Sequence, residues 1–197
     1  MSTLLLLFFI YSIIGLFYEA LTILVYEKKL DFNRGFLIGP YIPIYGIGAI
    51  LMLQIEKLST NIFTIFFLSF IICMSLEYIT SCLMEKIFKA RWWDYTDLKY
   101  NINGRVELGR LLSFAVMGVI VIKIFNPILL YVISFFPAYL LNIIVLTFTI
   151  IFLVDFFISL ILSYYQSKKL DSISNCDKTI YFRNEIKKRI LEFIKNI

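Results

Sequence analysis

Three acidic residues lie inside long apolar stretches of this sequence, where a charge is costly. They are Glu19, Glu77 and Asp155. An ionisable group at the centre of a membrane helix costs about 2.5–3.5 kcal/mol on insertion scales, so each is a candidate functional residue. Carboxylates in such a place either pair with arginines, orient them toward a ligand, or titrate. The sequence therefore predicts a polar site within an otherwise apolar protein.

One of these acids belongs to a polar stripe. Cys73, Glu77, Ser81 and Glu85 follow one another at intervals of four residues. Residues with this spacing lie on one face of a helix. We expect the stripe to face the interior of a helix bundle rather than lipid.

The groups that would complete the site come from connecting segments. Asparagine lies close to arginine twice, at Asn33 with Arg34 and at Asn103 with Arg105. Asn103 and Gly104 favour a turn that would place Arg105 at the start of the following helix. Arginine binds phosphate and carboxylate groups in a bidentate geometry. The candidate polar cavity comprises Glu19, Asn33, Arg34, Glu77, Ser81, Glu85, Asp94, Asn101, Asn103, Arg105 and Asp155.

Two interpretations of this set stay open. The acids and arginines could be structural pairs that fix helix packing. They could instead line a cytoplasm-facing cavity for an anionic or zwitterionic ligand, such as a lipid head group or a phosphorylated metabolite. The glycines and prolines of residues 33–46 favour the cavity, because unwound backbone at membrane depth must be covered by protein or water. Tight helix packing would explain Gly46 and Gly48 equally well.

The composition indicates that part of the surface of this protein is in contact with lipid. Of its 197 residues, 60% are hydrophobic and 17% are charged, and the mean hydropathy is +0.86. A soluble domain of this composition would expose large apolar patches. We expect an all-α transmembrane helix bundle over residues 1–165. The chain has no histidine and no C-x-x-C pair, so we expect neither a metal site nor a cofactor.

Five stretches are long enough to span a membrane. They are residues 4–26, 36–54, 62–83, 108–125 and 138–165. Residues 128–136 are too short to cross and would be re-entrant or interfacial. Of the 19 Lys and Arg residues, 17 fall in the first and third connections and the tail. Basic residues stay on the cytoplasmic side, so the N-terminus should be outside and the C-terminus cytoplasmic.

The C-terminal residues 166–197 form a basic tail. Apolar residues at positions 186, 190, 193, 194 and 197 alternate with lysines and arginines at helical spacing. We expect an amphipathic helix on the inner membrane surface or on the bundle, and a helix that docks a partner stays open. The net charge of +5 suits an anionic inner leaflet and requires no nucleic acid.

Three motifs carry a resemblance to a known family. They are Asn33-Arg34-Gly35-Phe36 with Gly39-Pro40 and Pro43-Ile44-Tyr45-Gly46; Glu77-Tyr78 with Ser81 and Glu85; and Trp92-Trp93-Asp94-Tyr95 with Asn101 and Asn103-Gly104-Arg105. Over about residues 8–130 the chain resembles the CmpB-like ABC-transporter type IV family. The resemblance implies a transport role. The sequence has no G-x-x-x-x-G-K-[ST] phosphate loop, so a separate ATPase subunit would have to supply the ATP hydrolysis.

We therefore expect a multi-pass protein of the cell membrane, either permease-like or a transport-associated subunit. Its expected partners are the lipid bilayer and an ATPase subunit, and a homo-oligomer stays open. One alternative is an enzyme acting on lipid head groups, with Asp94, Glu77 or Glu19 as general base and Arg34 and Arg105 holding phosphate. Another is a scaffold that recruits a partner through its basic tail.

Overall fold

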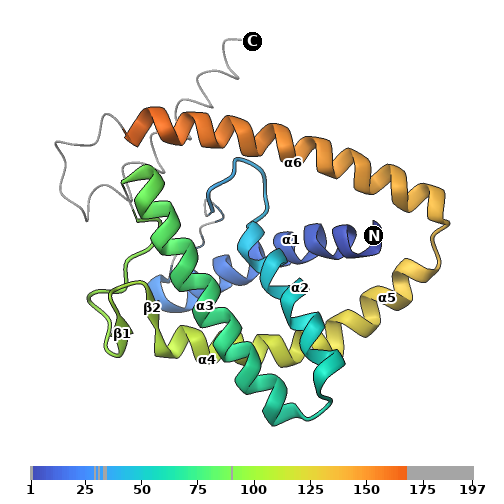
Figure 1. The fold of residues 1–197 in the computed structure, drawn as a ribbon, viewed down its shortest axis with the longest axis horizontal. Coiled ribbons are helices and arrows are strands. Elements are labelled where there is room, and N and C mark those ends of the chain that lie inside the picture. Colours follow the sequence, from blue (N-terminus) through green and yellow to red (C-terminus); the bar gives the residue numbers. More distant parts are fainter. Residues whose placement is uncertain (1, 29, 31, 33–34, 90, 168–197) are drawn as a thin grey trace.

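The described part of the chain is mostly helical (Figure 1). The computed structural model describes all residues except 1, 29, 31, 33–34, 90 and 168–197. The elements are α1 (Ser2–Glu27), α2 (Pro43–Leu58), α3 (Ile62–Phe88), β1 (Asn101–Ile102), β2 (Val106–Glu107), α4 (Leu108–Ile120), the π-helical turn η1 (Val121–Phe125), α5 (Asn126–Ser134) and α6 (Ala138–Ser167). The predicted all-α fold is confirmed, since the two strands have two residues each. The predicted tail helix, residues 179–197, lies outside the described residues.

Within the described residues, four helical stretches are long and apolar enough to cross a membrane. They are Ser2–Val25, Ile62–Phe88, Leu108–Ser134 and Ala138–Tyr164. A helix of 27 residues is about 40 Å long, which exceeds the roughly 30 Å hydrocarbon thickness of a bilayer. Many large apolar side chains on these helices are exposed, as expected for surfaces in contact with lipid. The chain is thus a multi-pass helical membrane protein.

The second predicted span, residues 36–54, is only partly helical. Residues 35–42, the entry segment, are irregular, and α2 begins at Pro43 with a length of 16 residues. A proline suits a helix start because the missing N–H would be unsatisfied there, and it disfavours helix in the preceding residue. The entry segment reaches the middle of α1, where the Ile42 amide donates to the Ser12 carbonyl at 2.9 Å. α2 therefore starts part-way along α1.

The fourth predicted span, residues 108–125, is longer than expected. α4 continues through η1 into α5, so the helix runs from Leu108 to Ser134. Most of residues 128–136, expected to be a separate connector, belong to α5, which corrects that expectation. The π turn η1 shifts the hydrogen-bond register just before Pro127, and such a shift lets a helix continue past a proline.

Helices α1 and α2 pack closely through a glycine. A Cβ atom on Gly46 would lie 2.3 Å from Ser12 Oγ and 2.6 Å from the Phe8 carbonyl oxygen. Gly48 has more room, because a Cβ there would meet only the Leu76 side chain, at 3.6 Å. Small residues let helices approach in this way. Tight packing therefore explains Gly46 but not Gly48.

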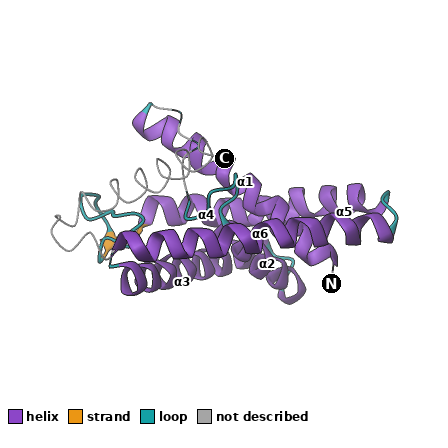
Figure 2. Cartoon of the chain, turned by 90° about the horizontal axis from the view of Figure 1, so that it is seen from above, coloured by secondary structure: helices purple, strands orange, loops and turns teal. Residues whose placement is uncertain are grey.

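The bundle has one end that collects the polar loops. In Figure 1 the C-terminal ends of α1, α3 and α6 and the N-terminal end of α4 lie at the same side as strands β1 and β2. The view from above agrees, with the strands at one end of the long helices and α5 at the other (Figure 2). The loop between α3 and α4 thus lies where the ends of four helices meet.

Candidate ligand cavity and its polar surroundings

A cavity of about 560 Å³ lies among α1, α2, α3, α4 and α6. It extends from Trp93, in the loop before β1, to Met52 of α2. Its walls are mainly aromatic and aliphatic. Among the described residues that line it, those with a charged side chain are Glu19 and Glu77. The volume and the apolar walls are typical of sites that bind small organic molecules.

The two acids in the cavity have tyrosine partners. The Tyr45 hydroxyl donates to Glu19 Oε2 at 2.6 Å, and the Tyr95 hydroxyl donates to Glu77 Oε1 at 3.1 Å. Burial raises the pKa of the Tyr95 phenol well above its usual value, and the negative charge of Glu77 raises it further. Tyr95 therefore keeps its proton and remains a donor at neutral pH.

The second carboxylate oxygen of Glu77 is different. The residue is only 6% exposed, and its Oε2 atom is buried with no hydrogen-bond partner among the described residues. An unsatisfied buried acceptor costs about 1–3 kcal/mol, and more when it is charged. Most such groups in proteins are paired, so this unpartnered oxygen requires an explanation.

Arg110 of α4 supplies a positive charge beside these acids. Its guanidinium carbon lies 4.7 Å from the centre of the Tyr95 ring, a cation–π distance. It also interacts electrostatically with Glu19 and Glu77. Glu107 fixes the start of α4 by accepting from the Gly109 amide at 2.7 Å and the Arg110 amide at 2.9 Å. This N-cap positions the arginine next to the cavity.

Asp155 is not among the residues that line the cavity. It accepts four hydrogen bonds: from the Ile38 amide at 3.0 Å, the Gly39 amide at 2.8 Å, the Tyr41 hydroxyl at 2.6 Å and the Ser159 hydroxyl at 3.0 Å. Backbone amides outside a helix need other acceptors when they are buried. Asp155 provides them, and so attaches the entry segment to α6.

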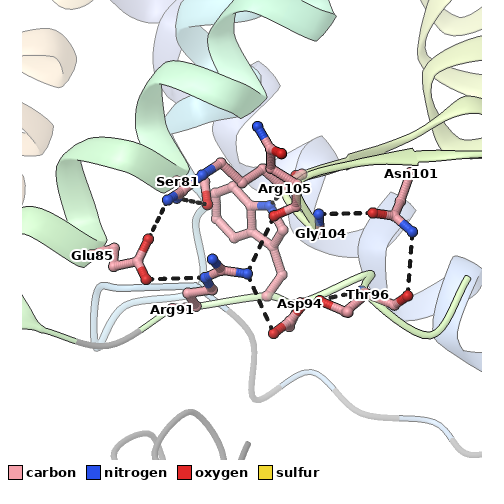
Figure 3. Close-up of polar contacts among 10 residues, drawn as sticks. Ser81, Glu85, Arg91, Asp94, Thr96, Asn101, Gly104 and Arg105 are labelled. Carbon is pink, nitrogen blue, oxygen red and sulfur yellow. Dashed lines mark hydrogen bonds and ion pairs between the residues drawn. The ribbon is translucent and has the colours of Figure 1, made fainter. Parts of the chain in front are cut away.

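A second polar network connects α3 to the hairpin loop, residues 91–107 (Figure 3). Glu85 accepts from Arg91 Nε at 3.1 Å and also from the guanidinium of Arg105. Arg105 Nη1 donates to Ser81 Oγ at 3.1 Å, and Arg91 pairs with Asp94 at 3.5 Å. These ionic contacts bind the loop to the end of α3.

The predicted turn at Asn103 and Gly104 is confirmed. Their φ angles are +54° and +68°, and the Arg105 amide donates to the Ile102 carbonyl at 3.0 Å. Asparagine and glycine tolerate this left-handed geometry. Asn101 Oδ1 accepts from the Gly104 amide at 2.8 Å. The turn therefore presents Arg105 to α3 rather than to the cavity.

The predicted site residues thus occupy different places. Glu19 and Glu77 line the cavity, and Asp155 holds the entry segment. Ser81, Glu85, Asp94, Asn101, Asn103 and Arg105 take part in the hairpin-loop network. Asn33 and Arg34 lie outside the described residues. The expectation that the α3 stripe faces inward is confirmed at Glu77 and Ser81, which are 6% and 2% exposed.

Sequence reasoning did not include Tyr45, Tyr95 and Arg110 in the site. Tyrosines in an aromatic-rich chain carry no signal of their own. Arg110 had a usable signal, because it is a basic residue in the first turn of an apolar helix.

Comparison with known proteins gives one match. The family model described as Putative ABC-transporter type IV matches residues 6–160. No curated protein and no solved structure matches the chain.

Proposed function

The chain belongs to the ABC-transporter type IV family, and from this premise we propose that it is a transport-associated membrane subunit that binds a ligand in the cavity. The observation that carries the proposal is the cavity itself. It is large enough for a small organic molecule, it is lined mainly by apolar side chains, and it contains one buried carboxylate oxygen without a partner.

The energy for transport comes from another protein in this proposal. The sequence contains no phosphate-binding G-x-x-x-x-G-K-[ST] motif. A separate ATPase would dock at the end of the bundle that carries the hairpin loop, where helices α1, α3, α4 and α6 have their ends (Figure 1). This end faces the cytoplasm, since the loops predicted to lie there hold most of the basic residues.

The segment from residue 35 to residue 58 makes an additional crossing in this arrangement. The entry segment reaches the middle of α1 from the cytoplasmic side, and α2 covers the remaining distance. Asp155 satisfies the irregular backbone, which is the condition for such a segment at membrane depth. The N-terminus is then outside and the C-terminus is cytoplasmic, with five crossings in total.

The ion pairs of the described arginines indicate which charge the ligand carries in this proposal. Arg91 and Arg105 are paired with Glu85, and Arg110 lies beside Glu19 and Glu77. An anionic ligand would have to displace these pairs. Of the two expected classes, a zwitterionic ligand therefore suits the cavity better than an anionic one.

Two residues expected to act in the lipid-enzyme alternative, Arg105 and Asp94, have other hydrogen-bond partners in the structure. This alternative requires Arg105 to hold phosphate near a general base such as Asp94. Arg105 instead bonds Glu85 and Ser81, and Asp94 is exposed and accepts from the Thr96 amide at 3.0 Å. These contacts favour a structural role for both residues.

Filling the cavity tests the proposal. We would purify the tagged full chain from its native membranes with any bound ATPase, reconstitute the complex, and measure ATP hydrolysis stimulated by a small-molecule extract of the same cells. Gly48→Leu should abolish the stimulation, because it adds a side chain at a lining position. Gly48→Ala is the matched control and should retain it, since its Cβ meets only an ordinary contact.

Two results would contradict the proposal. One is full stimulation in the Gly48→Leu complex. The other is a purified chain without any ATPase, together with a changed lipid profile in cells that lack the chain, which would favour the enzyme.

A further inference from the structure

The unpartnered oxygen of Glu77 indicates which kind of chemical group the cavity accepts. Tyr95 already donates to Oε1, so Oε2 remains as a buried acceptor at the cavity wall. A carboxylate oxygen can be satisfied by a hydrogen-bond donor but not by another acceptor. The ligand must therefore present a donor at this point.

The charges around the cavity favour a positively charged donor. Glu19 and Glu77 are two acids that line the cavity, and Arg110 is one cation that interacts with both. The acids outnumber this cation. Glu107, which also interacts electrostatically with Glu77, is a third acid. A buried charge is stabilised when a partner of opposite sign neutralises it.

The aromatic walls suit the same kind of group. The rings of Tyr18, Tyr45 and Phe114 contact one another with centroids 5.7 to 5.9 Å apart, and all three residues line the cavity. Aromatic faces attract ammonium groups, most strongly when the site is desolvated. The hydroxyl of Tyr45 is bonded to Glu19, so this wall and the acid lie together.

The rest of the cavity requires an apolar body. Beyond the acids, the walls include Met52, Leu76, Met117 and Val121. Such side chains accommodate alkyl or aryl groups and offer no strong hydrogen bonds.

We infer that the cavity binds an amphipathic organic cation, a protonated amine on an alkyl or aryl body, with its ammonium group between Glu77, Glu19 and the Tyr45 and Tyr95 rings. The inference rests on the proposed ligand-binding function and specifies the class of ligand. A zwitterion qualifies through its ammonium group, whereas a purely anionic amphiphile does not.

Binding of three matched probes tests the inference. The full chain is placed in nanodiscs of neutral lipid, and saturable binding of radiolabelled octylammonium is measured against nanodiscs without protein. Octanol and octanoate, which share the alkyl chain, serve as competitors. We expect octylammonium to bind saturably and octanoate to compete at least about tenfold more weakly than unlabelled octylammonium, which corresponds to about 1.4 kcal/mol.

A pair of substitutions locates the ammonium group. Glu77→Gln removes the charge while its amide oxygen can still accept from Tyr95, and it should weaken octylammonium binding about tenfold. Glu56→Gln is the matched control, because Glu56 does not line the cavity, and it should leave binding unchanged. Glu19→Gln gives a second reading if Glu77→Gln fails to yield folded protein, and it should also weaken binding.

The outcomes separate the two proposals. The cavity binds ligands but the amine inference is wrong if three results occur together: octanol competes as well as unlabelled octylammonium, Gly48→Leu blocks binding, and neither Glu77→Gln nor Glu19→Gln weakens it. Stronger competition by octanoate than by octanol overturns the inference as well. If none of the three probes binds saturably when each is radiolabelled in turn, the proposal of a ligand cavity is itself wrong.

Discussion

Asp155 and Glu77 are both buried acids, and their hydrogen-bond partners separate their roles. Asp155 accepts from four donors, and three of them belong to the entry segment. Glu77 accepts from one donor and keeps one oxygen without a partner among the described residues. A saturated carboxylate is committed to the fold, whereas an unsaturated one retains its capacity for a ligand. Substitution should therefore affect stability at one residue and binding at the other.

The first prediction concerns Asp155→Asn. This substitution replaces one of the two carboxylate oxygens with an NH₂ group, which cannot accept a hydrogen bond. In either orientation of the amide, at least one of the present donors therefore loses its acceptor. We expect a loss of about 1–3 kcal/mol in stability, measured as a lower melting temperature of the purified protein in detergent. Thr147→Val, at an exposed position of the same helix, should melt like the wild type. An unchanged melting temperature for Asp155→Asn would show that these bonds contribute little.

At the residue scale, the acids could be found from sequence but their partners could not. Glu19, Glu77 and Asp155 were recognisable because each interrupts an apolar run. Two of the four donors to Asp155 are the backbone amides of residues 38 and 39, and backbone amides leave no mark in a sequence. Which acid meets which loop depends on tertiary packing that helical periodicity does not encode.

At the scale of helices and loops, some features could likewise be predicted from the sequence and others could not. The apolar runs predicted the long helices, because hydrocarbon permits little other backbone structure. The entry segment and the start of α2 were indicated by Pro40, Pro43 and the nearby glycines. The continuity of α4 through η1 into α5 was not foreseen, because Pro127 normally indicates a break and the π turn that accommodates it has no sequence signal.

A second prediction compares two glycines of α2. Gly46→Ala would place a methyl group 2.3 Å from Ser12 Oγ, so α1 and α2 must separate, and overpacking of this kind costs about 1–3 kcal/mol. Gly48→Ala meets only an ordinary contact and gains helix propensity of up to about 1 kcal/mol. We expect Gly46→Ala to lower the melting temperature and Gly48→Ala to keep or raise it. Equal melting temperatures would show that the helices do not depend on this contact.

The third prediction concerns the hairpin loop, residues 91–107. Glu85 accepts from both Arg91 and Arg105, so Glu85→Gln weakens two charge-assisted bonds at once. Amide hydrogen exchange in residues 101–107 should become at least about tenfold faster, which corresponds to about 1.4 kcal/mol of local stability. Asp97→Asn, in the same loop and exposed, is the control and should exchange like the wild type. Unchanged exchange in Glu85→Gln would mean that the turn holds the loop without these ion pairs.

At the scale of the whole molecule, the number of crossings decides whether the two termini lie on the same side of the membrane. In the part of the chain that the structure describes, four helices are long enough to cross, and four crossings would leave the N- and C-termini on one side. A fifth crossing by residues 35–58 puts them on opposite sides and keeps the hairpin loop and the basic tail together in the cytoplasm. Charge favours the second arrangement, since it places 17 of the 19 basic residues on one side.

The last prediction decides between these arrangements with two introduced cysteines. Ser59 lies just beyond α2 and Asp97 lies in the hairpin loop. With Cys73, Cys82 and Cys176 replaced by serine, a membrane-impermeant maleimide added to intact cells should label Ser59→Cys and should label Asp97→Cys only after permeabilisation.

The span α3 separates these two positions whether or not α2 completes a crossing, so they alone cannot count the crossings. A cleavable tag at the N-terminus therefore provides the reference. Five crossings place the tag and Ser59 on the same side, because α1 and residues 35–58 cross in opposite directions. Four crossings place them on opposite sides, so labelling of Ser59 from the side opposite the tag would overturn the fifth crossing.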